Sequence, residues 1–234
     1  MHEHAPERTR MLAQVTGSGI EIGAYLSPLP VPETARVRYA DLFSLEDSRV
    51  FYPEAANDKA VRPDVIAPAD DLPMLGDGSE DFVLCSHLME HLADPIRALK
   101  EWWRVLRPGG LLLLILPDRR YTFDRMRGAT TLEHLISDHE QGADDSARSD
   151  RDQDHYRGWA RDVMGLSDPR HVDFLAELMR EADYPIHFHC WTLASIQELV
   201  GWLATAASIS FQARDSFESP EHGEFAVLLE KTAG

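Results

Sequence analysis

Two short apolar runs with one amphipathic helix between them constrain the fold of this chain more than any other feature. Residues 81–85 and 111–116 have the length and composition of strands that fill a parallel sheet covered on both faces. Asp94 and Pro95 supply an N-cap and a first-turn proline for the intervening helix, and residues 107–110 end it. This strand–helix–strand order predicts an α/β domain.

The alternation extends to both sides of this block. We expect further strands at residues 20–22, 36–40 and 64–67, a helix at 192–205, and strands at 208–213 and 224–230. The short connection between the last two predicts an antiparallel pair. Residues 1–16 predict a loose N-terminal arm. The expected fold is a Rossmann-like, doubly wound and mostly parallel sheet with an antiparallel last strand and an inserted helical lid.

Residues 119–191 interrupt the alternation, so we expect a core of residues 1–118 and 192–234 with residues 119–191 as a lid and substrate region. One strand is expected within the insertion, at about 185–190. Residues 133–155 carry eight acidic residues and two arginines, which supplies −6 of the net charge of −17. Such a polar segment buries little surface by itself, so we expect it to be ordered by ligand.

Composition excludes several partners. A net charge of −17 repels nucleic-acid backbones and anionic lipid headgroups, so neither nucleic acid nor a membrane is expected as a partner. The longest apolar run, 111–116, is far shorter than the roughly 20 residues of a spanning helix. Cys85 and Cys190 fit a reducing compartment, and we expect a cytoplasmic protein. The oligomeric state stays open, a homodimer included.

Ligands of doubly wound sheets bind outside the carboxyl ends of the strands. Asp41 ends the second expected strand about 20 residues after Gly23 and can accept hydrogen bonds from both hydroxyls of a ribose. Gly17 and Gly19 precede the first strand, so the chain lacks a glycine-rich phosphate cradle. These features predict an adenosine-type ligand without a pyrophosphate.

The chain resembles the class I S-adenosylmethionine-dependent methyltransferases. The resemblance runs through residues 19–29, 36–42, 70–73 and 81–118, with further matches at Ser27-Pro28-Leu29, Pro117–Asp124 and His189-Cys190-Trp191. It is closest to members acting on small molecules, natural products or glycans, with an insertion after the fifth strand. It implies S-adenosylmethionine as cofactor and a small-molecule acceptor. The cofactor-binding residues that it implies are Glu21, Gly23, Ala24, Tyr25, Asp41, Leu42, Ala69, Asp70, Asp71, Ser86 and His87.

The expected reaction is an in-line displacement at the sulfonium methyl group, with O- or N-methylation and histidine-assisted removal of a proton. His91 is the first candidate for the base, followed by His87 and Tyr121, with Asp124 as a competitor. A helical turn after Cys85 would place the imidazoles of His87 and His91 on one face.

Two alternatives remain open. One is a member of the same fold that binds the cofactor without methylating. The other is a metal-dependent hydrolase, because residues 87–91 match the HxxEH pattern. An extended chain at 187–189 would point two imidazoles to one face, a geometry able to hold a metal. Scattered histidines are more often surface or hydrogen-bonded residues, so no metal ion is expected. These histidines are His134, His139, His155, His171, His187 and His189.

Overall fold

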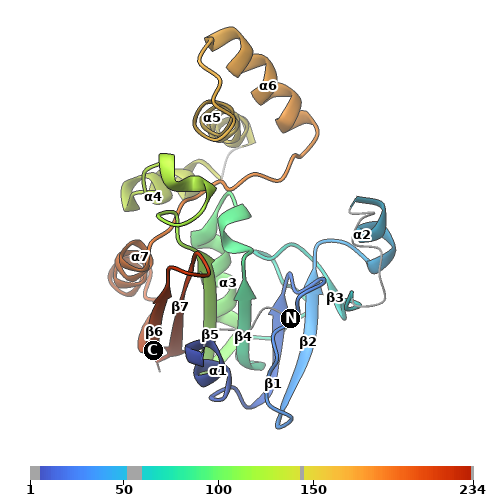
Figure 1. Cartoon of the computed structure of the whole chain (residues 1–234). Coiled ribbons are helices and arrows are strands. Elements are labelled where there is room, and N and C mark those ends of the chain that lie inside the picture. Colours follow the sequence, from blue (N-terminus) through green and yellow to red (C-terminus); the bar gives the residue numbers. More distant parts are fainter. Residues whose placement is uncertain (1–5, 52–59, 143–144, 233–234) are drawn as a thin grey trace.

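The structure is a computed structural model of the 234-residue chain and describes residues 6–51, 60–142 and 145–232. Its centre is a seven-stranded sheet with the order β3-β2-β1-β4-β5-β7-β6 (Figure 1). The first five strands in this order are parallel to one another. Strand β7 runs antiparallel to both of its neighbours, β5 and β6, and the antiparallel pair of β6 and β7 was expected. The strands are β1 Gly17–Ile22, β2 Ala35–Asp41, β3 Val65–Ile66, β4 Glu80–Ser86, β5 Leu106–Pro117, β6 Phe211–Ser219 and β7 Glu224–Lys231.

Helices cover the sheet and extend beyond its carboxyl edge (Figure 1). The α-helices are α1 Pro6–Leu12, α2 Leu45–Phe51, α3 Pro95–Val105, α4 Leu132–Gln141, α5 Asp145–Asp162, α6 Pro169–Glu181 and α7 Leu193–Ala206. Two short 3₁₀ turns are η2 Met89–His91 and η3 Phe123–Met126. None of the helices described here is long and apolar enough to cross a lipid bilayer.

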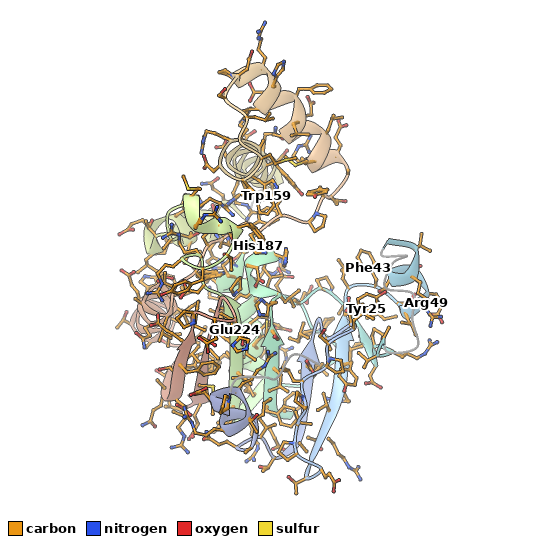
Figure 2. All side chains as sticks on the ribbon, in the orientation of Figure 1. Tyr25, Phe43, Arg49, Trp159, His187 and Glu224 are labelled. Carbon is orange, nitrogen blue, oxygen red and sulfur yellow. The ribbon has the colours of Figure 1, made fainter. Side chains whose placement is uncertain are left out.

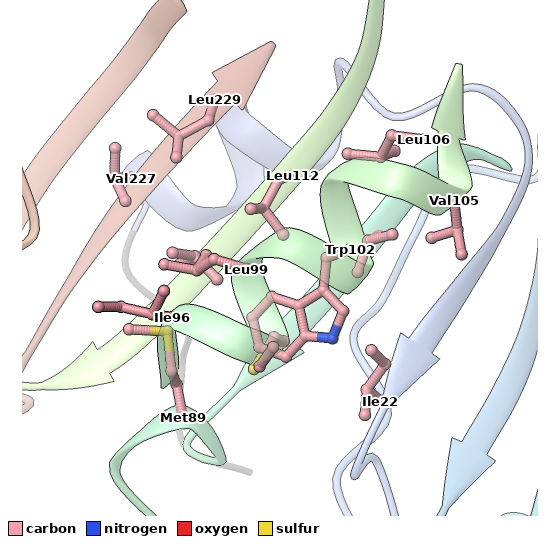
Figure 3. Close-up of a cluster of buried hydrophobic side chains, with 14 of the residues drawn as sticks. Ile22, Met89, Ile96, Leu99, Trp102, Val105, Leu106, Leu112, Val227 and Leu229 are labelled. Atoms are coloured by element: carbon pink, nitrogen blue, oxygen red, sulfur yellow. The ribbon is translucent and has the colours of Figure 1, made fainter. Parts of the chain in front are cut away.

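Helix α3 forms where the sequence places its signals. The carboxylate of Asp94 accepts a hydrogen bond from the N–H of Arg97 at 2.9 Å, and Pro95 occupies the first turn. Ile96, Leu99 and Trp102 are buried on one face, against Leu112, Val227 and Leu229 of the sheet (Figure 3). This packing fixes the loop between β4 and α3, which carries His87 and His91.

Two expectations about local structure are wrong. The described part of the N-terminal arm, residues 6–16, is not loose, because Met11, Leu12 and Val15 are fully or almost fully buried in an apolar cluster with β4 and β5. Strand β6 occupies 211–219 rather than 208–213, because an edge strand with one exposed face carries a weak apolar signal and the hairpin with β7 sets its register. Helix α2 lies in a segment for which we expected neither a helix nor a strand.

Residues 185–190 form no strand, which is a further correction; only a single bridge joins Trp191 to Asp118. The backbone of this segment bonds to side chains instead of to a ladder. The guanidinium of Arg127 donates to the carbonyls of His187 and Phe188 at 2.9 and 3.2 Å. The segment is therefore irregular but bonded at several points.

The insertion is helical. Helices α5 and α6 pack together through their own apolar cluster, which includes Trp159, Ala176 and Ile186. Figure 1 shows this pair beyond the edge at which β1, β2 and β4 end. Residues 143–144, in the acidic part of the insertion, lie outside the described residues.

Candidate functional site

A cavity of about 400 Å³ lies at the carboxyl ends of β1, β2 and β3, beside η2. Its size is within the range of small-molecule sites. Six of the residues expected to bind a cofactor line it: Gly23, Tyr25, Asp41, Leu42, Ala69 and Asp70. Phe43 and Leu92 add apolar walls, and Tyr25 and Phe43 lie near one another on the side of α2 (Figure 2).

Asp41 supplies a carboxylate at the end of β2. One of its oxygens accepts a long hydrogen bond, 3.4 Å, from the N–H of Phe43. Partial burial raises the pKa of Asp41 above its ordinary value, and hydrogen bonds from the backbone N–H groups of Phe43 and Leu42 act in the opposite direction. Asp41 lines the cavity, and a carboxylate can accept more hydrogen bonds than its backbone neighbours supply, as a pair of ribose hydroxyls requires.

Gly23 is placed at a position that suits glycine. Its φ is +72°, and a Cβ there would lie 3.1 Å from the side chain of Leu88. Its N–H donates to the carbonyl of Ala40 at 2.9 Å, which holds the turn against β2. Glycine therefore lets the backbone of the first turn pass close to η2.

Glu21 does not line the cavity. Its carboxylate is buried and accepts the N–H of Leu29 at 3.0 and 3.2 Å, so it closes the turn over residues 23–29. Burial raises the pKa of Glu21 to about 7, against the opposing effect of the Leu29 N–H. Glu21 therefore stabilises the turn through Leu29 and does not line the cavity.

Ser86, His87, Ala24 and Asp71 also lie away from the cavity lining. The Nε2 atom of His87 lies 3.0 Å from the carboxylate of Glu224 on β7. Arg8 of α1 donates to the hydroxyl of Ser86 at 3.2 Å and lies 3.6 Å from Glu224. Helix α1 thus covers the end of β4 and the start of β7. We did not expect this contact from the sequence.

The expected helical turn after Cys85 does not form, so His87 and His91 do not share a helix face. His87 has a φ of +50°, which directs the chain away from a helical path, and only the three-residue turn η2 follows. His87 contacts Glu224, whereas His91 contacts the segment before α7. This separation removes the paired histidines that an HxxEH hydrolase requires.

His91 lines the cavity and is held by one strong contact. Its Nδ1 atom lies 2.9 Å from the carbonyl oxygen of Ile186. A carbonyl only accepts, so Nδ1 carries the proton in the neutral ring and Nε2 keeps its lone pair. Burial, together with the neighbouring His187, lowers the pKa of His91 to about 4.

His187 lies directly beside His91. Its ring packs edge-on against that of His91 with centroids 4.8 Å apart, and its Nδ1 atom lies 2.6 Å from the carboxylate of Asp124. The ring of His187 also lies close to Trp159 of α5 (Figure 2). Asp124 therefore orients His187 rather than facing the cavity. Burial acts to raise the pKa of Asp124, but the pairing with His187 outweighs it and the pKa of Asp124 is lowered.

Glu90, the acid of the HxxEH pattern, is buried beside His91 and His187. One of its carboxylate oxygens has no hydrogen-bond partner among the described residues, and burial raises the pKa of Glu90. Ligand atoms of Glu90, His91 and His187 lie within 4.8 Å of one another. Tyr121, in contrast, is half exposed and its ring lies beside Arg120, away from the cavity lining.

Comparison with known proteins gives the site its context. Residues 22–114 match the model of a family described as a methyltransferase domain. This match places a methyltransferase domain in residues 22–114, and the family implies S-adenosylmethionine as the cofactor. The matched residues include the turn at Gly23, the strand end at Asp41 and the whole β4–η2–α3 block. The residues that line the cavity suit this family's cofactor, S-adenosylmethionine, since they offer a carboxylate for a ribose and apolar walls for a base.

The chain is also similar to a curated relative in sequence and to solved structures in fold. Thiol S-methyltransferase TMT1B of Homo sapiens is 46% identical over 48 residues, which are 20% of this chain and 20% of that protein. The matched segment thus spans about a fifth of this relative. A possible histamine N-methyltransferase from Thermotoga maritima has a TM-score of 0.50 at 16% identity, covering 97% of this chain and 88% of that one.

A Rhodobacter sphaeroides structure described as putative Zn-dependent alcohol dehydrogenases has a TM-score of 0.57 at 15% identity and covers 97% of this chain and 90% of that one. At these identities the structural matches show the fold alone. The chain therefore shares its overall fold with both of these solved structures.

Proposed function

We propose that the domain transfers the methyl group of S-adenosylmethionine to a small molecule, at a hydroxyl or amine, with His91 as the proton acceptor. One observation carries this proposal: His91 lines two adjoining cavities. The first, of about 400 Å³, also contains Asp41. The second, of about 220 Å³, lies between the β4–α3 loop and the insertion and contains Arg97 and Arg151.

The first cavity suits the cofactor. Asp41 would accept hydrogen bonds from the ribose hydroxyls, while Phe43 and Leu92 would flank the base. S-adenosylmethionine supplies an electrophilic methyl group on a sulfonium sulfur. Gly23 lets the backbone approach closely, and the apolar walls exclude water from this side of the site.

The second cavity suits the acceptor. Its volume of about 220 Å³ admits a small molecule, and its lining is polar. Because Arg97 lies beside Asp70 and Arg151 is paired with Asp152, this lining would suit a polar acceptor without selecting the sign of its charge. Asp70, His91 and Leu92 line both cavities, so an acceptor bound here would lie next to the cofactor space. Holding two reactants side by side in this way is worth several kcal/mol of the barrier.

His91 would take the acceptor's proton at Nε2 while Nδ1 donates to the Ile186 carbonyl. A pKa of about 4 keeps the imidazole neutral at pH 7, so its lone pair is available without prior deprotonation. Such a weak base suffices, because the O–H or N–H of an acceptor becomes strongly acidic as its new bond to carbon forms. His187, bound to Asp124, supports the His91 ring from the side.

The insertion would act as a lid over the acceptor. Pro185 lines the first cavity, and Gly142 and Arg151 line the second, so residues of 119–191 border both. Limited proteolysis near Arg151 should slow when S-adenosylhomocysteine and an acceptor are both bound. Equal cleavage rates with and without ligands would contradict a lid.

Two measurements test the proposed reaction. Calorimetry should show binding of S-adenosylmethionine and S-adenosylhomocysteine, and a screen of small polar alcohols, amines and thiols with methyl-labelled cofactor should give a labelled product. Thiols belong in the panel because a relative is a thiol S-methyltransferase. Binding without a product in any class would favour a cofactor-binding protein that does not methylate. If neither compound binds, both the proposed methyltransferase and a cofactor-binding protein that does not methylate would be contradicted.

A further inference from the structure

A second group of histidines lies in the insertion, outside the two cavities. His134 and Asp138 stand one turn apart on α4, His155 lies on α5, and His189 lies in the segment before α7. One ligand atom from each of these four side chains lies within 4.8 Å of the other three. Apart from the pair on α4, the four residues are 17 to 55 positions apart along the chain, so the fold rather than the local sequence brings them together.

The distances within this group have the scale of a metal site. The Nε2 atoms of His134, His155 and His189 lie 3.2, 3.1 and 3.8 Å from the same carboxylate oxygen of Asp138. Ligands about 2.0–2.2 Å from a tetrahedral zinc ion are about 3.3 Å from one another. The observed separations require only small shifts to meet this geometry.

Hydrogen bonding within the protein does not account for the group. Asp138, His155 and His189 are buried, and three imidazole nitrogens face a single carboxylate oxygen. The Nε2 atom of His189 makes only long contacts, 3.4 Å to the carbonyl oxygen of Ala93 and 3.8 Å to Asp138. One carboxylate oxygen and one distant carbonyl are poor partners for three converging imidazole nitrogens, two of them on buried side chains.

The nearby positive charge is turned away from the carboxylate. The guanidinium of Arg151 donates to the main-chain carbonyl of Asp138 at 3.1 Å and is paired with Asp152. Its contact therefore fixes the backbone of α4, while the side chain of Asp138 faces the histidines. A divalent cation at the centre of the group would neutralise this buried carboxylate.

We propose that His134, Asp138, His155 and His189 bind one Zn²⁺ ion in a four-coordinate site. Three imidazoles and one carboxylate form a donor set that zinc prefers, and four protein ligands are typical of a structural rather than a catalytic site. The side chain of His134 is 50% exposed, which offers the ion a path from solvent.

This zinc ion would join three separate elements next to the acceptor cavity. It would fasten α4 to α5 and both to the segment that contains Ile186 and His187, whose contacts hold His91. The ion would therefore stabilise the insertion and help to position His91, without touching the reacting atoms. The proposal does not depend on methyl transfer, because it concerns only the residues of the insertion.

The test is reconstitution of the full chain after treatment with a chelator. Zinc titration followed by desalting and metal analysis should give about one ion per chain, and zinc should raise the midpoint of thermal unfolding. Co²⁺ in place of zinc should give the intense visible absorption bands of a tetrahedral site. The variants His134→Ala, Asp138→Asn, His155→Ala and His189→Ala should each lose the stoichiometric ion.

His134→Ala is the decisive variant, because this half-exposed side chain can be removed without emptying the core. His171→Ala is the matched control, an exposed histidine on α6 that should keep one ion per chain. The variant His187→Ala should also keep the ion, which separates this site from the group around Glu90 and His91. Wild-type protein that retains no zinc after reconstitution, or a His134→Ala variant that binds it as tightly as wild type, would overturn the proposal.

Discussion

The Nδ1 atom of His91 lies 2.9 Å from the carbonyl oxygen of Ile186, a residue 95 positions later in the chain. His91 belongs to the turn after β4, and Ile186 is buried in the apolar cluster of α5 and α6. This hydrogen bond is one of several that join the part of the chain matching the methyltransferase domain to the insertion; His139 also bonds Asp94. The bond to Ile186 also fixes which ring nitrogen of His91 is free, so folding of the insertion sets the chemical state of the proposed base.

The first prediction concerns the base itself. His91→Gln should lower turnover by roughly 10²–10⁴-fold, because glutamine cannot accept a proton at this position. The dissociation constant of S-adenosylhomocysteine should change little, since Asp41 and the apolar walls remain. His171→Gln, on the exposed face of α6, serves as the control. A His91→Gln enzyme with more than half of wild-type turnover would remove His91 from the reaction.

The acid limb of the pH–rate profile gives a second prediction. With a pKa of about 4, His91 remains neutral down to pH 5.5, so kcat/KM should stay within about twofold between pH 5.5 and 7.5 for an acceptor that does not titrate there. A histidine with the ordinary pKa of about 6.5 would lose about tenfold over this range. A tenfold fall that disappears in His91→Gln would show that the imidazole is more exposed to water than the structure indicates.

The third prediction tests the cofactor side of the site. Asp41→Asn removes the charge but keeps the shape of the side chain, and hydrogen bonds to a charged group are worth about 1.5–3 kcal/mol. We expect the cofactor dissociation constant to rise about 10- to 100-fold by calorimetry. Asp77→Asn, a largely exposed carboxylate beside Arg104, is the control. An affinity within twofold of wild type would remove Asp41 as a ribose ligand.

Glu21 gives a fourth prediction, on stability. Its folded-state pKa of about 7 exceeds the ordinary value, so between about pH 4.5 and 7 the folded state binds more protons than the unfolded state. The contribution of Glu21 is therefore fully present below pH 4.5 and is lost as the pH rises through 7. Glu21→Gln keeps an acceptor for the Leu29 N–H without the charge, so its midpoint of urea unfolding relative to wild type should increase from pH 5 to pH 8. A difference independent of pH would contradict a protonated Glu21.

Periodicity and turn residues were enough to predict the sheet, because each strand–helix boundary from β4 to β5 carries its own signal. Asp94 and Pro95 begin α3, and the apolar run at 111–116 needs both faces covered. The family resemblance predicted the cofactor from the same residues. Asp41 and Gly23 at the cavity follow directly from their positions at the ends of β2 and β1.

The group around His91 could not be predicted in this way, because long-range contacts decide it. Nothing near His91 in the sequence indicates that Ile186 will bind its ring, or that His187 will pair with Asp124. The expectation that His187 and His189 share one face was wrong for the same reason. Their segment bonds to Arg127 rather than to a strand, so His187 joins His91 and His189 joins His155.

The last prediction links the core to the cavity through Trp102. This side chain is fully buried, and its indole N–H donates to the carbonyl of Ala69, whose residue lines the first cavity. Trp102→Phe leaves that carbonyl without its donor, which costs about 1–3 kcal/mol of unfolding free energy. We expect cofactor affinity to fall as well. Trp103→Phe removes a comparable bond to Ser210 and should reduce stability alone. Equal cofactor affinity in the two variants would show that Trp102 does not position Ala69.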